Sequence, residues 1–407
     1  MTPSIHCFNA TERISFGEPA TTAVIKELGR TGSQRVFVLG SRSVAMTPSY
    51  QAIIRALGSR CVGQFTNITA HVPQACVLEG AQAARAANAD VLLAIGGGSV
   101  IDATKVMLVA MKKGLSTPAQ LHEAAGFAAT DGSVRPSDAA EWLRMIAVPT
   151  TLSAAEFTWF AGCSDTTARV KEIFGYPMTA PRAVIVDPLV TLDTPMNLFL
   201  SSGIKAVDHA AEFMAMLNVD PCVDAFGTAA LGLLSKGLPR VLVNPTDLDA
   251  RLDCQRGMAM SIRILEFGAR VGASHAIGHV FGAHAEISQA QAMFGRQPDR
   301  FAKAQFMAFV DAGFGLHFLA HWVRETQTFT LAEGIRRLTS HPAHCFRIPD
   351  RGRLVEGAPA GIAFFIGIYD VLNNLGLAPD AQVAGMTGCV DGQCSAWGER
   401  FAMHTTW

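Results

Sequence analysis

The 407-residue sequence contains little charge, and neither sign is in clear excess. Only 16% of the residues are Asp, Glu, Lys or Arg, and the formal net charge is −1. This balance gives no electrostatic reason to expect binding to nucleic acid or to an anionic membrane surface. Long hydrophobic runs are missing as well, because Gly, Pro or charged residues interrupt the apolar stretches well short of the roughly 20 residues of a transmembrane helix. The sequence therefore predicts no nucleic-acid partner and no membrane partner.

Cysteine is scattered along the chain rather than clustered. The nine cysteines are odd in number, and the closely spaced Cys389 and Cys394 have no second pair nearby with which to form a zinc site. The N-terminus lacks the basic and then apolar layout of a secretory signal. These features fit reduced thiols and predict a cytoplasmic protein. With 49% hydrophobic residues the chain can bury a sizeable core, in one large domain or in two.

The first half of the sequence alternates short β-rich runs with helical stretches. This alternation predicts an α/β domain with a doubly wound parallel sheet, in which ligands bind at the carboxyl ends of the strands. The expected strands cover residues 35–39, 62–65, 91–95, 146–148 and 183–186, and the expected helices between them cover residues 50–57 and 77–87.

The pattern becomes helical after about Pro188. We therefore expect two domains, an α/β dinucleotide-binding domain over residues 1–187 and an all-helical domain over residues 188–407. Helices are predicted at residues 203–217, 224–243, 247–268 and 302–325. The tail after about residue 378 has little periodicity and is expected to be poorly ordered.

A glycine turn follows the apolar run at residues 91–95. Gly96, Gly97 and Gly98 precede Ser99, and the sequence then continues as a helix. Glycines have no Cβ atom to hold a ligand away from the backbone, and the free amides at a helix start attract anions. The turn therefore predicts a site for the pyrophosphate of a nucleotide. The alternative is a glycine-rich strand–helix turn without a ligand.

Two further stretches carry polar groups that suit catalysis or binding. The loop after residue 148 contains Thr150 and Thr151, whose hydroxyls could bond a ribose or a nicotinamide amide. The same loop also reads as an ordinary helix start, with Ser153 and Glu156 forming a capping box, and the two interpretations are compatible.

The second stretch begins at residue 203. Lys205, His209 and Glu212 share one face of the expected helix, being four and three residues apart. The alternative is a buried histidine bonded to a neighbouring residue.

Three histidines fall within ten residues at His275, His279 and His284. The first two are four residues apart and share a helical face. This spacing suits two metal ligands, or one ligand together with a proton shuttle.

The order of these motifs resembles that of the iron-containing (group III) alcohol dehydrogenases, and within them the maleylacetate reductase branch. The motifs are Gly-Gly-Gly-Ser-x-x-Asp-x-x-Lys, Pro-Thr-Thr-x-x-x-x-Glu, Asp-Pro, Gly-x-x-Ala-x-x-His-x-x-Glu and His-x-x-x-His. The resemblance runs from about residue 10 to about residue 290. It implies the dehydroquinate synthase-like architecture of that family, with a nucleotide-binding α/β domain, a helical domain and a cleft between them. It also implies NAD(P)(H) and hydride transfer to or from a small carbonyl compound or alcohol.

The resemblance also implies roles for individual residues. Gly96, Gly97, Gly98 and Ser99 match the phosphate loop, with Asp102 and Lys105 following, and Thr150 and Thr151 match the loop beside the nicotinamide end. His209 and His275 match two metal-binding histidines, and His279 matches the histidine beside the nicotinamide, where a proton relay would lie.

The metal site departs from the family pattern. Lys205 stands where the family has a metal-binding aspartate, four residues before the first histidine. The last metal-binding histidine falls on Gln289 by count, or on His284 if the loop is shorter. A protonated lysine repels a metal ion and can itself polarise a substrate oxygen. Maleylacetate reductases likewise lack the aspartate, so we expect iron or zinc to be absent, with His209, His275 and His284 as the alternative ligands.

The cofactor preference also departs from many relatives. Where they carry an aspartate after the first strand, this sequence has Ser41 and Arg42, which favours NADP(H) or tolerance of both cofactors. The sequence thus predicts a homodimeric reductase acting on a small molecule. The alternatives are a non-redox isomerase, dehydratase or cyclase that uses Lys205, His209 and His279 as acid–base groups, and a pseudoenzyme that only binds.

Overall fold

The structure is a computed structural model, and it describes residues 5–127, 138–167, 170–214 and 220–269 together with Thr330 and Glu333. The chain divides into two compact units, Met1–Ala290 and Gln291–Trp407. The architecture below belongs to the first unit.

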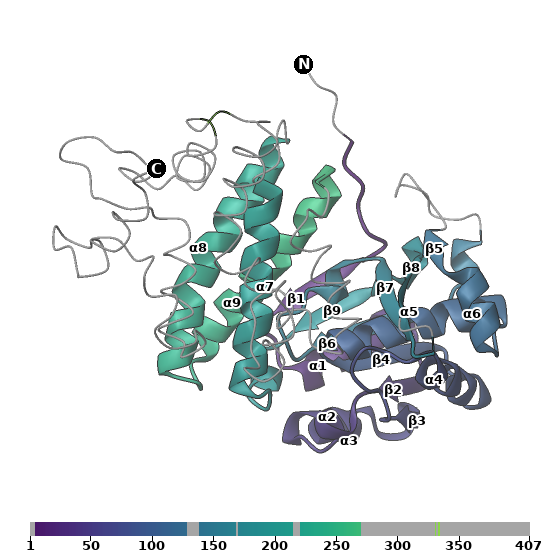
Figure 1. Ribbon diagram of the computed structural model, residues 1–407. Helices are drawn as coiled ribbons and strands as arrows, with labels where there is room; N and C mark the ends of the chain where they lie inside the picture. The colour runs from purple at the N-terminus through teal and green to yellow at the C-terminus, as the bar shows by residue number, and fades with distance from the viewer. Residues whose placement is uncertain are drawn as a thin grey trace, which may run out of the picture. The chain divides into compact units, whose positions relative to one another are not determined.

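A six-stranded, wholly parallel sheet forms the centre of the α/β part, in the order β1-β9-β6-β4-β2-β3 (Figure 1). The strands are β1 (Arg13–Phe16), β2 (Val36–Leu39), β3 (Cys61–Phe65), β4 (Val91–Gly96), β6 (Arg144–Pro149) and β9 (Ala183–Val186). All six residues of β4 are buried, as expected for a central strand covered on both faces. The predicted doubly wound parallel sheet is confirmed.

Helices cover both faces of this sheet because successive side chains of each strand point to opposite sides. Leu93 and Ile95 pack with buried residues of the helices α1 and α3, whereas Leu92 and Ala94 pack with those of α4 and α5. The helices of this part are α1 (Ala20–Thr31), α2 (Arg42–Ala45), α3 (Pro48–Leu57), α4 (Gln74–Ala86), α5 (Gly98–Lys113) and α6 (Pro118–Ala124).

The strand order reverses between β2 and β4. From β2 the chain moves outward to β3, and it then returns to β4 on the other side of β2 before continuing to β6. In doubly wound sheets the crevice at such a reversal, beyond the carboxyl ends of the two strands, is where ligands bind. Here Gly40 follows β2 and Gly96 ends β4, so the predicted glycine turn lies at this crevice.

A second, three-stranded sheet is formed by one strand that precedes β6 in the chain and two that follow it. It contains β5 (Gly126–Phe127), β8 (Val170–Gly175) and β7 (Phe160–Asp165) in that order, and β7 and β8 are antiparallel. The sequence had not predicted this sheet, nor the edge strand β1 and the helix α1.

Three helices follow the α/β part and pack against one another (Figure 1). They are α7 (Met196–Met214), α8 (Pro221–Val243) and α9 (Leu248–Arg263). The expected helical character after Pro188 is therefore confirmed for the described residues. Several of the expected limits were wrong, and α8 begins at Pro221 rather than at residue 224. Helix α7 begins at Met196 rather than at residue 203, because Phe199 and Leu200 extend its buried face. Helix α9 ends at Arg263, before a 3-10 turn.

Some predictions fall elsewhere in the chain. The helix expected at residues 302–325 and the tail after residue 378 lie outside the described residues. None of the described helices is both long and apolar enough to cross a membrane.

Candidate active site

The glycine turn joins the central strand to the longest helix of the α/β part. Gly97 has an extended backbone and caps α5, which begins at Gly98. Gly97, Gly98 and Ser99 are half-buried, so this turn is reachable from outside. The first amides of an α-helix have no partner within the helix, and the helix dipole adds positive potential there. The predicted strand, glycine turn and helix are present.

The hydroxyl-rich loop after β6, residues 150–158 and called the hydroxyl loop below, packs directly on this turn. The amide of Thr150 donates to the Gly96 carbonyl at 3.1 Å. A Cβ atom added to Gly97 would lie 2.9 Å from Thr151 Cγ2, and one added to Gly98 would lie 3.0 Å from Ser153 Oγ. The glycines therefore allow two loops to approach each other, a role that the sequence analysis did not foresee.

Two buried hydroxyls of that loop lack hydrogen-bond partners among the described residues, Thr151 Oγ1 and Ser153 Oγ. The capping box expected for Ser153 and Glu156 is wrong. The short 3-10 turn η3 (Ala155–Phe157) follows Ala154, which has a left-handed backbone with φ 68° and makes no side-chain cap. Buried polar atoms are normally paired, so unpaired ones beside an anion site mark a place for a ligand. The turn and its neighbouring hydroxyls thus fit a dinucleotide.

Lys105 holds the hydroxyl loop in place. Its buried Nζ donates to the carbonyls of Ala155 at 2.6 Å and Phe160 at 2.9 Å, and to Thr158 Oγ1 at 2.8 Å. Burial lowers the pKa of Lys105 to about 8, against the opposing charges of Asp102 and Glu156. With all three protons of its ammonium group committed, Lys105 serves to join α5 to the loop.

Asp102 also bonds within the protein. Its Oδ2 accepts from the amide of Gly162 on β7 at 3.3 Å. The side chain predicted to bind the cofactor is therefore directed to the small sheet in this structure.

Helix α7 presents one face to the hydroxyl loop. Ser202 Oγ accepts from the amide of Leu152 at 3.0 Å. Lys205 and His209 stand three and seven residues after Ser202, on the same helical face. The expected common face of Lys205 and His209 is thus turned toward the loop that packs on the glycine turn.

Lys205 is a half-buried cation. Within the part of the chain that the structure describes, its Nζ makes no hydrogen bond and no ion pair. Burial and the nearby charge of Lys171 lower the pKa of Lys205 to about 8, although Asp102, Asp208 and Glu156 oppose them. His209 is buried, and its ring stacks on Phe213 with 6.2 Å between centroids.

Glu156 is a charged residue of the site that the sequence analysis did not propose as functional. It is completely buried, and neither carboxylate oxygen has a hydrogen-bond partner in the described ranges. Burial raises the pKa of Glu156 to about 7, against its own backbone amide and the charges of Lys105 and Lys205. One sequence feature could have revealed it, because this acid stands between apolar neighbours, Ala155 and Phe157.

Arg42 lies beyond the carboxyl end of β2, on the other side of the crevice. Ser41 Oγ caps the short helix α2 by accepting from the amide of Val44 at 3.3 Å. The exposed Arg42 donates from Nε to Asn67 Oδ1, which follows β3, at 3.0 Å. The arginine is therefore held at the crevice.

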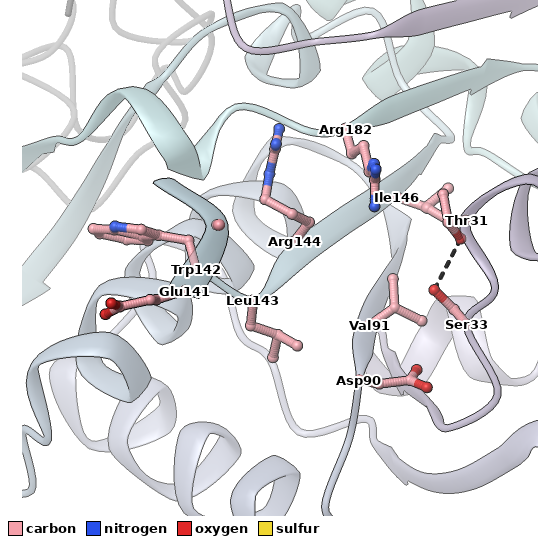
Figure 2. Close-up of a pocket in the computed structure, with 11 residues that line it drawn as sticks. Thr31, Ser33, Asp90, Val91, Glu141, Trp142, Leu143, Arg144, Ile146 and Arg182 are labelled. Carbon is pink, nitrogen blue, oxygen red and sulfur yellow. Dashed lines mark hydrogen bonds between the residues drawn. The ribbon is translucent and has the colours of Figure 1, made fainter. Parts of the chain in front are cut away.

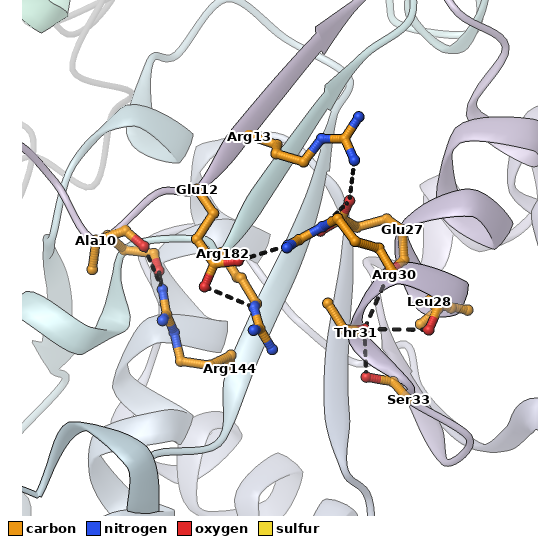
Figure 3. A network of polar contacts seen from close by, with 11 residues as sticks. Ala10, Glu12, Arg13, Glu27, Leu28, Arg30, Thr31, Ser33, Arg144 and Arg182 are labelled. Carbon is orange, nitrogen blue, oxygen red and sulfur yellow. Dashed lines mark hydrogen bonds and ion pairs between the residues drawn. The ribbon is translucent and has the colours of Figure 1, made fainter.

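A cavity of about 370 Å³ lies at the opposite end of the strands from the glycine turn, at the amino ends of β4 and β6 (Figure 2). Charged side chains that line it form hydrogen bonds within the protein. Asp90 accepts from the amides of Gln34 and Arg35, and Glu12 accepts from Arg182 at 2.9 Å and from Arg30 at 2.7 Å (Figure 3).

Glu12 shows that this network is structural. Burial alone would raise the pKa of Glu12, but hydrogen bonds from Arg182 and Arg30 outweigh it and lower the pKa. This side of the sheet is therefore held together by ion pairs, and the unpaired polar atoms of the candidate site lie at the other side.

Comparison with known proteins identifies the family. The family described as iron-containing alcohol dehydrogenase matches residues 11–188, and its C-terminal domain matches residues 199–301. The dehydrogenase ALT3 of Alternaria alternata is 31% identical over 276 residues, which cover 63% of this chain and 70% of that protein. The chain belongs to the iron-containing alcohol dehydrogenase family. It is an oxidoreductase, as the predicted resemblance implied.

Within this iron-containing alcohol dehydrogenase family the chain is similar to maleylacetate reductases. Maleylacetate reductase 1 of Cupriavidus pinatubonensis is 28% identical over 283 residues, 69% of each chain. The crystal structure of a maleylacetate reductase from Rhizobium sp. superimposes with a TM-score of 0.64 at 23% identity, covering 94% of this chain and 87% of the other. The expected branch and fold class are confirmed.

The described residues do not supply the donor set of an iron-containing alcohol dehydrogenase. They include one predicted ligand, His209, while the predicted His275, His284 and the proton relay His279 lie outside the described residues. Lys205 brings an ammonium group to the position four residues before His209, and an ammonium repels a divalent cation at close range. Within the described ranges one group of three potential ligands occurs, His6, Asp220 and Cys222, and it contains none of the predicted ones. We therefore derive no catalytic step through a metal.

Proposed function

We propose that this oxidoreductase transfers hydride between NADP(H) or NAD(H) and a small carbonyl compound or alcohol. The observation that carries the proposal is the turn at the end of β4, where half-buried glycines open α5 beside two buried hydroxyls that have no hydrogen-bond partner in the described part of the chain. The helix amides suit a pyrophosphate, and Thr151 and Ser153 suit the polar groups of the nicotinamide half. When bound, the cofactor supplies the hydride, and the residues of the chain bind and orient it.

Lys205 is proposed to stabilise the reacting oxygen. Hydride addition to a carbonyl carbon leaves an alkoxide, which needs a stabilising charge and a proton. The ammonium of Lys205 supplies the charge from the face of α7 that meets the hydroxyl loop. By resemblance to the family, His279 delivers the proton. His209, on the same face of α7 as Lys205, is proposed to help hold the same oxygen.

The charges around Lys205 favour a substrate that carries an anionic group. Lys171 and Lys205 are both half-buried, and neither makes an ion pair among the described residues. Their repulsion is relieved when a carboxylate binds between or beside them. Keto acids are therefore the first substrates to test, in keeping with the maleylacetate reductases among the relatives.

Purified protein is expected to contain no stoichiometric iron or zinc. The reason is the ammonium of Lys205 where the family has an acidic ligand. Elemental analysis of protein prepared without chelator measures this directly, and Lys205→Asp serves as the comparison, since it restores the acid and should raise metal content. About one metal per wild-type chain, with activity lost to chelator and restored by Zn²⁺ or Fe²⁺, would contradict the expectation.

Arg42→Ala is expected to weaken NADPH binding about 10-fold and to leave NADH binding nearly unchanged. An arginine at this end of the crevice can form charge-assisted hydrogen bonds to the 2′-phosphate that only NADPH carries. Fluorescence titration with both cofactors measures the effect. Arg55→Ala, which removes an exposed arginine of α3, is the matched control. Equal losses for NADPH and NADH would exclude Arg42 as the residue that reads the phosphate.

The proposed function is tested by screening keto acids and aldehydes for consumption of NADPH. We expect at least one keto acid to give NADPH-dependent reduction. A substrate that turns over without change in NADPH absorbance would favour the isomerase, dehydratase or cyclase alternative instead.

The predicted cytoplasmic homodimer is a separate proposal, and light scattering on a sizing column measures the assembly.

A further inference from the structure

The hydroxyl loop contains a strained backbone turn. Ala154 has a left-handed backbone with φ 68°, a conformation that a non-glycine residue keeps only where the surrounding structure holds it. It lies between η3 and Ser153, whose buried hydroxyl has no hydrogen-bond partner in the described part of the chain. Because Ser153 directly precedes Ala154, the groups that hold η3 also fix the position of Ser153.

Hydrogen bonds from two separate elements hold this turn. Within the turn, the amide of Phe157 donates to the Ala154 carbonyl at 3.1 Å. From α5, Lys105 Nζ donates to the Ala155 carbonyl at 2.6 Å. From the segment that precedes β1, Asn9 Nδ2 donates to the Phe157 carbonyl at 2.6 Å. Lys105 and Asn9 therefore hold the two ends of η3.

The side chain of Asn9 is itself held by an ion pair. Its Nδ2 also donates to Glu266 Oε1 at 3.2 Å. Glu266 is buried in the 3-10 turn η6 (Ile264–Phe267), and its Oε2 accepts from Arg263 Nε at 3.1 Å and from Arg263 Nη2 at 2.9 Å. An amide nitrogen carries two hydrogens, and here both are donated to oxygens that only accept, those of the Phe157 carbonyl and the Glu266 carboxylate. The network therefore fixes which atom of the Asn9 amide is the nitrogen.

The segment that carries Asn9 is fastened without this side chain. The backbone amide of Cys7 donates to the Glu266 carbonyl at 2.7 Å. Arg144 Nη2 donates to the Ala10 carbonyl at 2.8 Å (Figure 3). These two bonds use backbone groups of the segment on both sides of Asn9. The amide of Asn9 can therefore be removed with the segment still in place, and its bond to η3 acts on the hydroxyl loop.

We propose that Asn9 is a positioning residue that holds the strained turn of the hydroxyl loop, and with it the Ser153 hydroxyl, in the geometry that receives the nicotinamide half of the cofactor. The proposal rests on the cofactor site of the proposed function. Asn9 touches neither cofactor nor substrate and acts through the Phe157 carbonyl. Without its bond, one hydrogen bond fewer opposes the strain at Ala154, so the turn adopts the receiving geometry less often.

Hydrogen exchange of the protein without nucleotide tests whether Asn9 holds the turn. Mass spectrometry of peptides that cover residues 153–158 reports local opening there. We expect Asn9→Ala to raise the exchange rate of the Phe157 and Thr158 amides about 3- to 10-fold, the change expected for loss of one hydrogen bond. Gln34→Ala is the matched control and should leave these rates unchanged. Gln34 is exposed and also donates a side-chain amide to a backbone carbonyl, that of Gly32 at 3.4 Å, just before β2.

Asn9→Leu separates the hydrogen bonds of Asn9 from its packing. Leucine has nearly the branched shape of asparagine but donates no hydrogen bond. We expect the turn to exchange as fast in Asn9→Leu as in Asn9→Ala. Wild-type exchange rates in Asn9→Leu would mean that Asn9 only fills space, and this result would overturn the proposal.

Two nucleotides separate positioning from a general loss of stability. NADPH carries the nicotinamide half, whereas adenosine 2′,5′-bisphosphate is the adenosine half alone. We expect Asn9→Ala to weaken NADPH binding about 3- to 10-fold and to leave binding of the bisphosphate within about twofold, because only the receiving geometry of the loop is less populated. Titration calorimetry measures both affinities. Equal losses would overturn the proposal, since a merely structural residue lowers the folded fraction and both affinities together.

The outcomes are distinct from those that test the proposed function. Exchange is measured without nucleotide, so an unchanged turn in folded Asn9→Ala and Asn9→Leu overturns this proposal alone. Failure of both variants to fold also overturns it, because the bonds at Cys7 and Ala10 should hold the segment without the side chain. Wild-type protein that binds neither nucleotide overturns the proposed function and this proposal with it.

Discussion

Lys205→Ala is expected to lower kcat by about 100- to 10,000-fold on the true substrate while leaving NADPH affinity nearly unchanged. Lys205 lies on the face of α7 that meets the hydroxyl loop, and its ammonium is a charge available to a developing alkoxide in the described site. Its loss removes stabilisation that exists mainly in the transition state, so kcat falls more than binding does. Steady-state kinetics with saturating NADPH measures the effect.

The control for this variant is Lys236→Ala, which removes an exposed lysine of α8 and should leave kcat unchanged. The wild-type rate should also decline above about pH 8, because the ammonium form of Lys205 is lost there. A Lys205→Ala enzyme with wild-type kcat would remove Lys205 from the mechanism and return the stabilising role to a metal or to another cation.

Gly97→Val is expected to weaken NADPH binding by about 100-fold or more. The new Cβ atom would lie 2.9 Å from Thr151 Cγ2. Thr151 is buried and β-branched, so it has little freedom to move aside. The substitution both separates the two loops and covers helix amides that bind the pyrophosphate, and each charge-assisted hydrogen bond lost costs roughly 1.5–3 kcal/mol. Fluorescence titration with NADPH measures the loss.

Gly29→Val is the matched control for Gly97→Val, because Gly29 lies on the exposed face of α1 and nothing is within 4 Å of its added Cβ. This control should bind NADPH as wild type does. Thermal unfolding of both variants separates lost affinity from lost stability. Equal NADPH affinity in wild type and in folded Gly97→Val would contradict the assignment of this turn to the cofactor.

Local sequence patterns predicted the centre of the fold well. The buried strand β4 is an apolar run ended by three glycines, so neighbouring residues in the sequence predict both that the strand exists and where it ends. The edge strand β1 has no buried residue in its four positions, and α1 begins after Pro19 without a side-chain cap, so the usual local signs were missing. Strand β7 contains Gly162, whose open side is filled by the chain of Lys171 from β8, and only the paired strands make that contact visible.

The candidate site was predictable where chemistry is local and not where it depends on tertiary contacts. Spacing placed Lys205 and His209 on one helical face, and the structure turns that face toward the hydroxyl loop. The spacing of Ser153 and Glu156 is that of a capping box. The structure has none, because Ala154 has a left-handed backbone and the carboxylate of Glu156 is buried. The bonds of Lys105 to a loop about fifty residues away have no local sign either.

Transfer of deuterium from NADPH labelled at C4 of the nicotinamide tests the central claim most directly. The experiment is a single turnover with the substrate found by screening, followed by mass spectrometry of the product. The account predicts one deuterium on the carbon of the reduced carbonyl, from only one of the two C4-labelled isomers. Product formed without deuterium from either isomer, and without oxidation of NADPH, would contradict it.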